Sequence, residues 1–538
     1  MNAPLRGWLV LATGLLLALA ASCWNYYQVF TENGGVHFVD ADCYSRMTRV
    51  RAVAEHPGEV IRDHRFENYP FGTRPHTTIP FDYAVYALSL PLKPFSGARA
   101  LDLAGAWISP LLGLATIFIV WLWAERTQLP ARPLVVLILA ASPIVAHGFE
   151  LGRPDHQSLI LLCMAAALSS EWQLWQDPSR GWGIVSGVAW ALGLWTSLYE
   201  PTILLVLVIV AAVIWNRPAF RQRARLPGLA IGGGILALAL LIEGWRIGAP
   251  PGFGEDNAVE YFAAWSQQIG ELSKLNPWSS TIYAWTGFGL LAAPVFLAYN
   301  RGNLIPTARA HGLLLWAVFG LTCWQVRWGY FLPLVYALSL PWQLPAIPAR
   351  WHPVAIGLIV LGLYPLGSEW WTRLHPTPAV VENRTEQRTD ATLLHEVAVF
   401  IRQNTASAPA PSDDAPAGVL APWWLSPALA YWSGEPALAG SSHESLPGTV
   451  DVARFYTADD VPTVAAILRR RRVRWVVAYE PDRVLRTAAP LLGLTRVSTR
   501  AMGFVLYQRP TAAPPFLRLA MVNPYFKIYE VQVGSLPP

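Results

Sequence analysis

Long apolar stretches recur along the first two thirds of this 538-residue chain, and they constrain its fold more than any other feature. Because a helix rises about 1.5 Å per residue, windows of roughly 17 to 23 residues can cross about 30 Å of hydrocarbon. We count about eleven such windows. Hydrophobic residues make up 53% of the chain and charged residues only 14%, which excludes an ordinary soluble globular protein. The sequence therefore predicts a polytopic α-helical membrane protein with about eleven spans.

The arginines predict which side of the membrane each loop faces, because cytoplasmic loops carry an excess of Lys and Arg. The clearest basic loop contains Arg217, Arg221, Arg223 and Arg225. With this loop inside, the amino terminus also lies in the cytoplasm, and the segments expected outside are residues 34–99, the short turns at 152–157 and 199–201, and the loop 248–277. We therefore expect a multi-pass protein of the cell (inner) membrane whose acidic residues face the extracytoplasmic side.

The composition changes after residue 371 and predicts a second domain outside the membrane. Residues 372–538 are more charged, include a Pro-rich linker at 405–416, and contain no apolar run long enough to span a bilayer. A helix is expected over 390–403, and an amphipathic helix over 461–472 precedes an apolar strand at 473–479. The expected architecture is a transmembrane catalytic domain at 1–371 followed by a soluble, periplasmic α/β domain.

Three acidic sites lie far apart in sequence, yet all fall on the outer side of the membrane, next to a predicted span. They are Asp42, Asp155 with its neighbour His156, and Glu271. Each alone has an ordinary explanation: Asp42 as part of a solvated loop, Asp155 as the cap of a helix N-terminus, and Glu271 as part of an amphipathic segment. Carboxylates gathered at a bilayer edge are explained more simply by a bound divalent cation. The three sites together predict a metal-assisted membrane enzyme.

Six short motifs follow one another along the chain: Asp42–Arg46, a Tyr-Pro-x-Gly stretch within Glu67–Pro75, Asp155–Gln157, Ile269–Glu271, Arg327 within Gln325–Trp328, and Trp423-Trp424-Leu425. Their order resembles the catalytic subunits of oligosaccharyltransferases, including the single-subunit bacterial and archaeal forms, which have the GT-C glycosyltransferase fold. In that family, a second Asp-x-Asp or Asp-x-Glu stands at the place of Asp155–Gln157, and Trp-Trp-Asp at the place of Trp423-Trp424-Leu425. The resemblance covers most of the chain.

The resemblance implies a transfer of a glycan from a polyprenyl diphosphate carrier to an acceptor, expected to be protein, on the outer face. It makes Asp42, Asp155 and Glu271 both the catalytic residues and the ligands of Mg²⁺ or Mn²⁺, with His156 as an additional ligand or an acceptor-side group. Carboxylate oxygens suit either ion, and a neutral imidazole favours Mn²⁺. Such a cation neutralises the charge on a departing diphosphate.

Further residues are expected to contact the substrates. Arg327 would hold the diphosphate, because a guanidinium offers donors matched to phosphate oxygens. Without the family, the alternative is an arginine that extends to the membrane interface. The other expected substrate contacts are Tyr69, Arg74, Gln157, Trp423 and Trp424. His76 could add to the anion site beside Arg74, although loop solvation explains both residues equally well, and the tryptophans could simply pack one domain onto another.

Two departures from the family pattern leave the acceptor open. Leu425 stands where the family has an aspartate that bonds the Ser or Thr of an acceptor sequon, and Gln157 replaces an acid. One alternative is therefore a GT-C transferase that uses a polyprenyl-monophosphate sugar to modify lipid or polysaccharide. Another is a non-catalytic paralogue. The formal net charge of +5 includes no dense basic block, so nucleic acid is not an expected partner.

Overall fold

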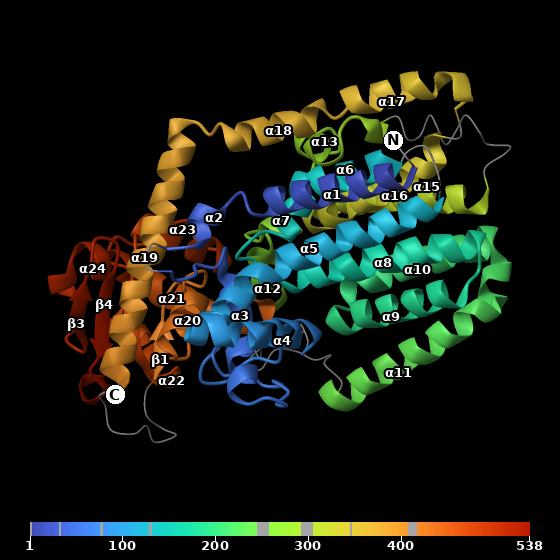
Figure 1. Cartoon of the computed structure of the whole chain (residues 1–538). Helices are drawn as coiled ribbons and strands as arrows, with labels where there is room; N and C mark the ends of the chain where they lie inside the picture. The colour runs from blue at the N-terminus through green and yellow to red at the C-terminus, as the bar shows by residue number, and fades with distance from the viewer. Residues whose placement is uncertain are drawn as a thin grey trace. The chain divides into compact units, whose positions relative to one another are not determined.

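The structure is a computed structural model that describes residues 3–31, 34–75, 79–127, 132–244, 258–291, 305–344, 347–406 and 417–537. The chain forms two compact units (Figure 1). Unit 1 comprises Met1–Val36, Thr77–Gly244 and Gly270–Thr377. Unit 2 comprises His37–His76, Trp245–Ile269 and Pro378–Pro538. The predicted site residues are divided between the units, since Asp42 belongs to unit 2 whereas Asp155 and Glu271 belong to unit 1.

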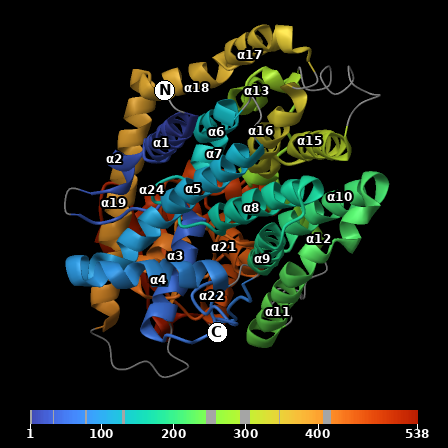
Figure 2. The same ribbon diagram turned by 45° about the vertical axis from the view of Figure 1, so that its right-hand side comes forward.

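Unit 1 is built from helices, and the longer ones lie side by side in both views (Figures 1 and 2). Its α-helices are α1 (Ala3–Ser22), α2 (Tyr26–Val29), α4 (Ile79–Ser96), α5 (Ala100–Thr127), α6 (Arg132–Ala141), α7 (Pro143–Gly148), α8 (His156–Gln176), α9 (Arg180–Thr196), α10 (Tyr199–Trp215), α11 (Leu226–Glu243), α13 (Ser280–Thr286), α15 (Pro306–Trp324), α16 (Phe331–Gln343), α17 (His352–Leu361) and α18 (Tyr364–Leu374). Within the described residues, short 3₁₀ turns connect them: η1 (Gly97–Arg99), η2 (Arg217–Arg221), η3 (Arg223–Arg225), η4 (Gly270–Leu272), η5 (Val326–Tyr330) and η7 (Ala349–Trp351).

The helical membrane architecture predicted from the sequence is confirmed, although the number of spans stays a prediction. Within the described residues, five helical stretches are long and apolar enough to cross a bilayer: Leu5–Ser22, Ile79–Arg126, His156–Gln176, Arg223–Glu243 and Ala349–Leu374. Two shorter apolar helices, Arg132–Ala141 and Tyr199–Trp215, accompany them. The stretch from Ile79 joins α4 to α5, so the last part of the segment expected as the outer loop 34–99 is an apolar helix.

Helices α9 and α11 approach each other through glycines. A methyl group added to Gly228 would lie 1.8 Å from the backbone oxygen of Gly183, and one added to Gly187 would lie 2.0 Å from that of Gly228. No side chain larger than hydrogen fits between the two backbones at these positions. Small residues spaced four apart permit this kind of close packing between membrane helices.

Unit 2 contains a four-stranded sheet surrounded by helices. The strands β1 (Gly418–Leu420), β2 (Val473–Ala478), β3 (Leu517–Val522) and β4 (Lys527–Val531) are arranged in the order β1-β2-β4-β3. β1 is parallel to β2, and β4 is antiparallel to both β2 and β3. The helices are α3 (Ala41–Glu55), α12 (Ala258–Ser266), α19 (Pro378–Ala406), α20 (Ser426–Ser433), α21 (Leu446–Thr457), α22 (Val461–Arg470), α23 (Pro481–Leu491) and α24 (Met502–Gln508), with 3₁₀ turns η8 (His443–Ser445), η9 (Pro510–Ala512) and η10 (Val533–Ser535).

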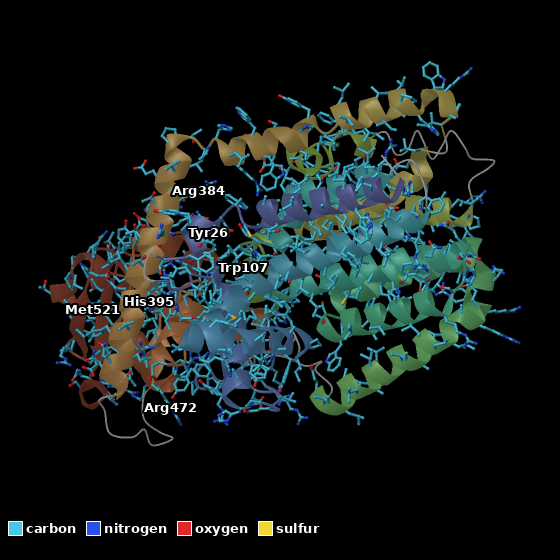
Figure 3. All side chains as sticks on the ribbon, viewed as in Figure 1. Tyr26, Trp107, Arg384, His395, Arg472 and Met521 are labelled. Carbon is cyan, nitrogen blue, oxygen red and sulfur yellow. The ribbon has the colours of Figure 1, made fainter. Side chains whose placement is uncertain are left out.

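The α/β character predicted for the C-terminal residues is confirmed in unit 2. The expected helix and strand after residue 460 are α22 and β2, within two residues of their predicted ends. The helix expected over 390–403 is the second half of the much longer α19, along which Arg384 and His395 lie (Figure 3). The predicted linker at 405–416 lies almost wholly outside the described residues.

Candidate active site

Asp155 stands at the N-terminal end of α8, but its carboxylate does not cap that helix. The residue has the extended backbone of a capping position, with φ −114° and ψ 138°, and its side chain accepts no capping hydrogen bond within the described structure. Ser158 instead bonds the backbone oxygen of Asp155 through both its N–H, at 3.1 Å, and its hydroxyl, at 2.8 Å. The carboxylate Oδ1 lies 2.6 Å from Nδ1 of His156. Capping therefore does not explain why an acid stands here.

Glu271 is brought to the same part of unit 1 by backbone pairing between two connecting segments. The N–H of Leu275 donates to the oxygen of Cys323, and the N–H of Val326 donates to the oxygen of Ser273, both at 3.0 Å. These bonds hold η4, which carries Glu271, beside η5. As a result, the Tyr330 hydroxyl donates to Glu271 Oε1 at 3.3 Å.

Arg327 lies among three carboxylates of unit 1. Its guanidinium forms an ion pair of 2.5 Å with Glu200, whose side chain is fully buried in the first turn of α10. Glu271 and Asp155 also interact electrostatically with the Arg327 charge. Three carboxylates and one guanidinium leave two negative charges, which a divalent cation would balance. Two of the three predicted acidic ligands thus lie near the predicted anion-binding arginine.

Four residues without a predicted role complete this polar group. Arg153 donates to Nε2 of His147 at 3.0 Å and lies 3.6 Å from the Glu150 carboxylate. Nδ1 of His147 is 2.9 Å from the Tyr330 hydroxyl. His147 reaches this position because the helix ends at Ala141 and α7 restarts with Pro143, a residue that suits the first turn of a helix. The sequence signal was the polar run around Asp155, which includes Glu150 and Arg153.

Gln157, predicted as a substrate contact, is almost completely buried at the start of α8. It is 4% exposed, and its Nε2 has no hydrogen-bond partner among the described residues. A buried amide donor without a partner costs free energy, so this side chain is poised to bond a group that enters the site. Its role toward a substrate stays a prediction.

Asp42 lies in the first turn of α3 in unit 2, two residues after the residue that caps the helix. Asp40 is that cap, because its carboxylate accepts from the N–H of Cys43 at 3.0 Å. Asp42 therefore does not cap α3, just as the side chain of Asp155 does not cap α8. Over the described residues, no group of three or more His, Cys, Asp or Glu side chains is arranged as a metal site within the structure. The convergence of Asp42 on the acids of unit 1 stays a prediction.

Tyr69 and Arg74, two further predicted substrate contacts, lie in a loop that is bound to the sheet of unit 2. The N–H of Tyr69 donates to the oxygen of Ala437 at 3.2 Å, and a methyl group on Gly418 of β1 would lie 2.9 Å from the Tyr69 ring. The guanidinium of Arg471 donates to the backbone oxygen of Tyr69 at 3.2 Å. Arg74 is largely exposed and lies 3.6 Å from Asp63. His76 lies outside the described residues.

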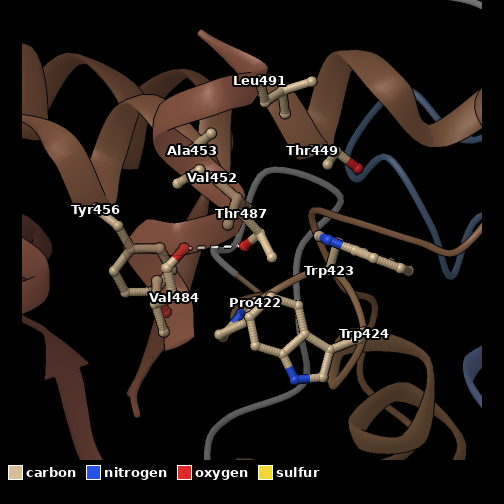
Figure 4. Close-up of a pocket in the computed structure, with 11 residues that line it drawn as sticks. Pro422, Trp423, Trp424, Thr449, Val452, Ala453, Tyr456, Val484, Thr487 and Leu491 are labelled. Carbon is tan, nitrogen blue, oxygen red and sulfur yellow. Dashed lines mark hydrogen bonds between the residues drawn. The ribbon is translucent and has the colours of Figure 1, made fainter. Parts of the chain in front are cut away.

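Trp423 and Trp424 line a small pocket in unit 2 that is partly open to solvent (Figure 4). Its walls come from α21 and α23, and the lining residues are Pro422, Trp423, Trp424, Thr449, Val452, Ala453, Tyr456, Val484, Thr487, Ala488 and Leu491. The lining contains hydroxyl groups and no carboxylate. Leu425 is not part of it, and its side chain is 7% exposed at the beginning of α20. The tryptophan pair thus borders a small, partly open pocket beside α21 and α23.

The sequence comparisons place this chain near two groups of lipid-dependent sugar transferases. The family model described as dolichyl-phosphate-mannose-protein mannosyltransferase matches residues 97–245. A curated relative, dolichyl-phosphooligosaccharide-protein glycotransferase 1 of Archaeoglobus fulgidus, is 26% identical over 209 residues, which are 38% of this chain. The match spans about a third of that relative, namely 33% of its length.

The structural comparisons extend over nearly the whole chain. An oligosaccharyltransferase of Archaeoglobus fulgidus, in complex with Zn and sulfate, superposes with a TM-score of 0.64 at 15% identity, covering 95% of this chain and 78% of the other. The archaeal oligosaccharyltransferase AglB in complex with an inhibitory peptide and a dolichol-phosphate gives a TM-score of 0.64 at 14% identity, with coverages of 96% and 79%. ArnT from Cupriavidus metallidurans, bound to undecaprenyl phosphate, gives 0.53 at 13% identity and covers both chains fully, at 100% each.

These likenesses confirm the resemblance predicted from the motifs, together with the fold. The chain has the GT-C fold of the oligosaccharyltransferase catalytic subunits, and its sequence is similar to one of them over part of its length.

Proposed function

We propose that this protein is a membrane glycosyltransferase of the oligosaccharyltransferase type, which moves a glycan from a polyprenyl-diphosphate carrier to an acceptor at the extracytoplasmic face and depends on a divalent cation. The observation that carries the proposal is the group of Arg327, Glu200, Asp155 and Glu271 in unit 1. It combines a guanidinium suited to phosphate oxygens with excess carboxylate charge suited to a hard cation.

The donor diphosphate is bound by Arg327 in this proposal. Glu200 holds the guanidinium in place, and because Arg327 is only 22% exposed and Glu200 is fully buried, their interaction acts in a medium of low dielectric constant. A fixed guanidinium loses little side-chain entropy when a phosphate binds. The pairing with Glu200 therefore preorganises the anion site.

Asp155 and Glu271 of unit 1, together with Asp42 of unit 2, would hold Mn²⁺ or Mg²⁺. When bound, the cation supplies Lewis-acid stabilisation of the charge that develops on the departing diphosphate. His156 is oriented for a contribution through Nε2, because its Nδ1 faces the Asp155 carboxylate. This use of a carboxylate to orient an imidazole is common beside protein-bound metals.

The acceptor is selected without the carboxylate that the family places after its tryptophan pair. The pocket beside Trp423 and Trp424 presents the hydroxyl groups of Thr449 and Thr487, and the Thr487 hydroxyl donates to the backbone oxygen of Val484 at 2.9 Å. Leu425 cannot accept a hydrogen bond. We therefore expect a weak preference for Ser or Thr two residues after the modified position of a peptide acceptor.

An assay with the full-length protein tests this proposal. Lipid-linked oligosaccharides extracted from the source membranes are incubated with purified protein, a fluorescent peptide library and Mn²⁺, and products are identified by mass spectrometry. Glycopeptide, or free glycan released by water, is expected with wild type and is reduced at least about a hundredfold by Glu271→Gln or Asp155→Asn. The matched control is Glu125→Gln, since Glu125 pairs with Arg132 at 3.0 Å and is no part of the site.

One observation favours a second candidate, a transferase that uses a polyprenyl-monophosphate sugar. The family model that matches residues 97–245 and the likeness to an undecaprenyl-phosphate-bound structure both concern monophosphate carriers. Polyprenyl-phosphate mannose added in place of the extracted donor separates the two. Turnover of that sugar, with full activity retained by Glu271→Gln, would refute the diphosphate proposal.

A further inference from the structure

The hydrogen bonds between α7, η5 and η4 have a direction that follows from their chemistry. A guanidinium can only donate, so Nε2 of His147, which lies 3.0 Å from Arg153, must be the acceptor. The neutral ring then carries its proton on Nδ1. That N–H donates to the Tyr330 oxygen at 2.9 Å.

The Tyr330 hydroxyl in turn has its own proton available for Glu271. Because its oxygen already accepts from His147, the O–H is directed to the carboxylate oxygen Oε1 of Glu271 at 3.3 Å. The rings of His147 and Tyr330 are nearly parallel, with 12° between their planes, which keeps the contact in one orientation. Donation runs from Arg153 through His147 and Tyr330 to Glu271.

We propose that Tyr330 is a positioning residue for Glu271, and that His147 and Arg153 set the orientation of the Tyr330 hydroxyl. The inference rests on the proposed function, in which Glu271 holds the divalent cation. A hydrogen bond to one oxygen of the Glu271 carboxylate restricts the rotation of that carboxylate. Hydrogen bonds of this kind to metal-ligating carboxylates typically contribute tenfold to a hundredfold in metal affinity.

The burial of the hydrogen-bonded residues Arg153 and Tyr330 supports a positioning role. Arg153 is 7% exposed, and besides its contact with His147 it lies 3.6 Å from the Glu150 carboxylate. Tyr330 is 3% exposed and lies where η5 meets α16, a helix of the unit 1 core. Glu271, by contrast, lies in a turn of three residues. Tyr330, which is held in the core of unit 1, therefore orients Glu271, which is less constrained.

Equilibrium binding of Mn²⁺ to the full-length protein, followed by electron paramagnetic resonance without any donor or acceptor, tests the inference. Tyr330→Phe is expected to weaken Mn²⁺ binding about tenfold, because the 3.3 Å bond is longer than a strong O–H to oxygen bond. His147→Asn retains an amide donor near the position of Nδ1 and should restore most of the affinity that His147→Leu loses. The control is Tyr283→Phe, which removes a hydroxyl bonded at 3.1 Å to the backbone oxygen of Pro277.

The outcomes separate this inference from the function on which it rests. If wild-type protein binds no Mn²⁺, the proposed function fails and the inference fails with it. If wild type and Tyr330→Phe bind Mn²⁺ equally, only the inference is refuted. A Tyr330→Phe protein that loses Mn²⁺ affinity but unfolds at the same temperature as Tyr283→Phe supports a positioning role over a general loss of structure. A loss of Mn²⁺ affinity in His147→Asn as large as in His147→Leu would contradict the proposed direction of hydrogen-bond donation.

Discussion

Glu67 in unit 2 offers a quantitative test of the packing described here. Glu67 is 2% exposed, its Oε1 has no hydrogen-bond partner among the described residues, and a methyl group on Gly440 would lie 2.4 Å from its Oε2. Burial raises the pKa of Glu67 from 4.5 to about 7, against the opposing effects of a hydrogen bond from Ser45 and the charge of Arg49. Folding therefore favours the protonated form.

The sign and size of the pH effect follow from this shift. Between pH 4.5 and about 7 the folded state keeps a proton that the unfolded state has lost, so the free energy of unfolding falls as pH rises and levels off above the folded pKa. At about 1.4 kcal/mol per pKa unit, the loss is about 3 kcal/mol. Glu67→Gln is neutral at every pH and should remove this loss.

Thermal unfolding followed by tryptophan fluorescence between pH 4.5 and 8 measures the effect. For a unit of this size, about 3 kcal/mol corresponds to roughly 6 to 12 °C, so Glu67→Gln should melt that much above wild type at pH 8 and near it at pH 4.5. Glu382→Gln, which alters an exposed carboxylate of α19, is the control and should follow wild type. Equal pH dependence of wild type and Glu67→Gln would refute the reasoning.

Three further substitutions test the fold and the site. Gly228→Val should destabilise unit 1 by about 3 kcal/mol or more and reduce the monodisperse fraction of protein in detergent. Gly234→Val in the same helix should do neither, because a methyl group there meets nothing within 4 Å. Equal monodisperse fractions for the two variants would contradict the close packing of α9 and α11. Leu425→Asp should lower the melting temperature by burying an unpaired charge and confer no sequon preference, so a stable, sequon-selective variant would overturn that expectation. Glu200→Gln should weaken donor binding about tenfold by releasing Arg327, and an unchanged KM for the lipid-linked donor would argue against that pair as the anion site.

The fold was predictable because its main signal is local. Each apolar window reports on its own capacity to span a bilayer, and the amphipathic helix before β2 was recognised from its own periodicity. Boundaries were less predictable. α4 was expected as the last part of the outer loop 34–99, yet it is an apolar helix that contains both Pro91 and Pro94.

The sequence marked candidate site residues only where a motif was present. Asp155, Glu271 and Arg327 lie in recognisable stretches, and in the structure the charges of Asp155 and Glu271 act on Arg327. Glu200 was expected on the outer face but received no role, because its pairing with Arg327 depends on how α10 packs beside η5. His147 and Tyr330 are 183 positions apart, and nothing local in either residue indicates the other.

The most direct test of the central claim is the stoichiometry and affinity of Mn²⁺ bound to purified full-length protein. The account predicts about one tightly bound ion per chain, with affinity reduced at least about tenfold in each of Asp42→Asn, Asp155→Asn and Glu271→Gln and unchanged in Glu125→Gln. Wild-type affinity in Asp42→Asn would show that the acid of unit 2 does not join those of unit 1 around one ion. Absence of specific Mn²⁺ binding in wild type would contradict the metal-assisted mechanism altogether.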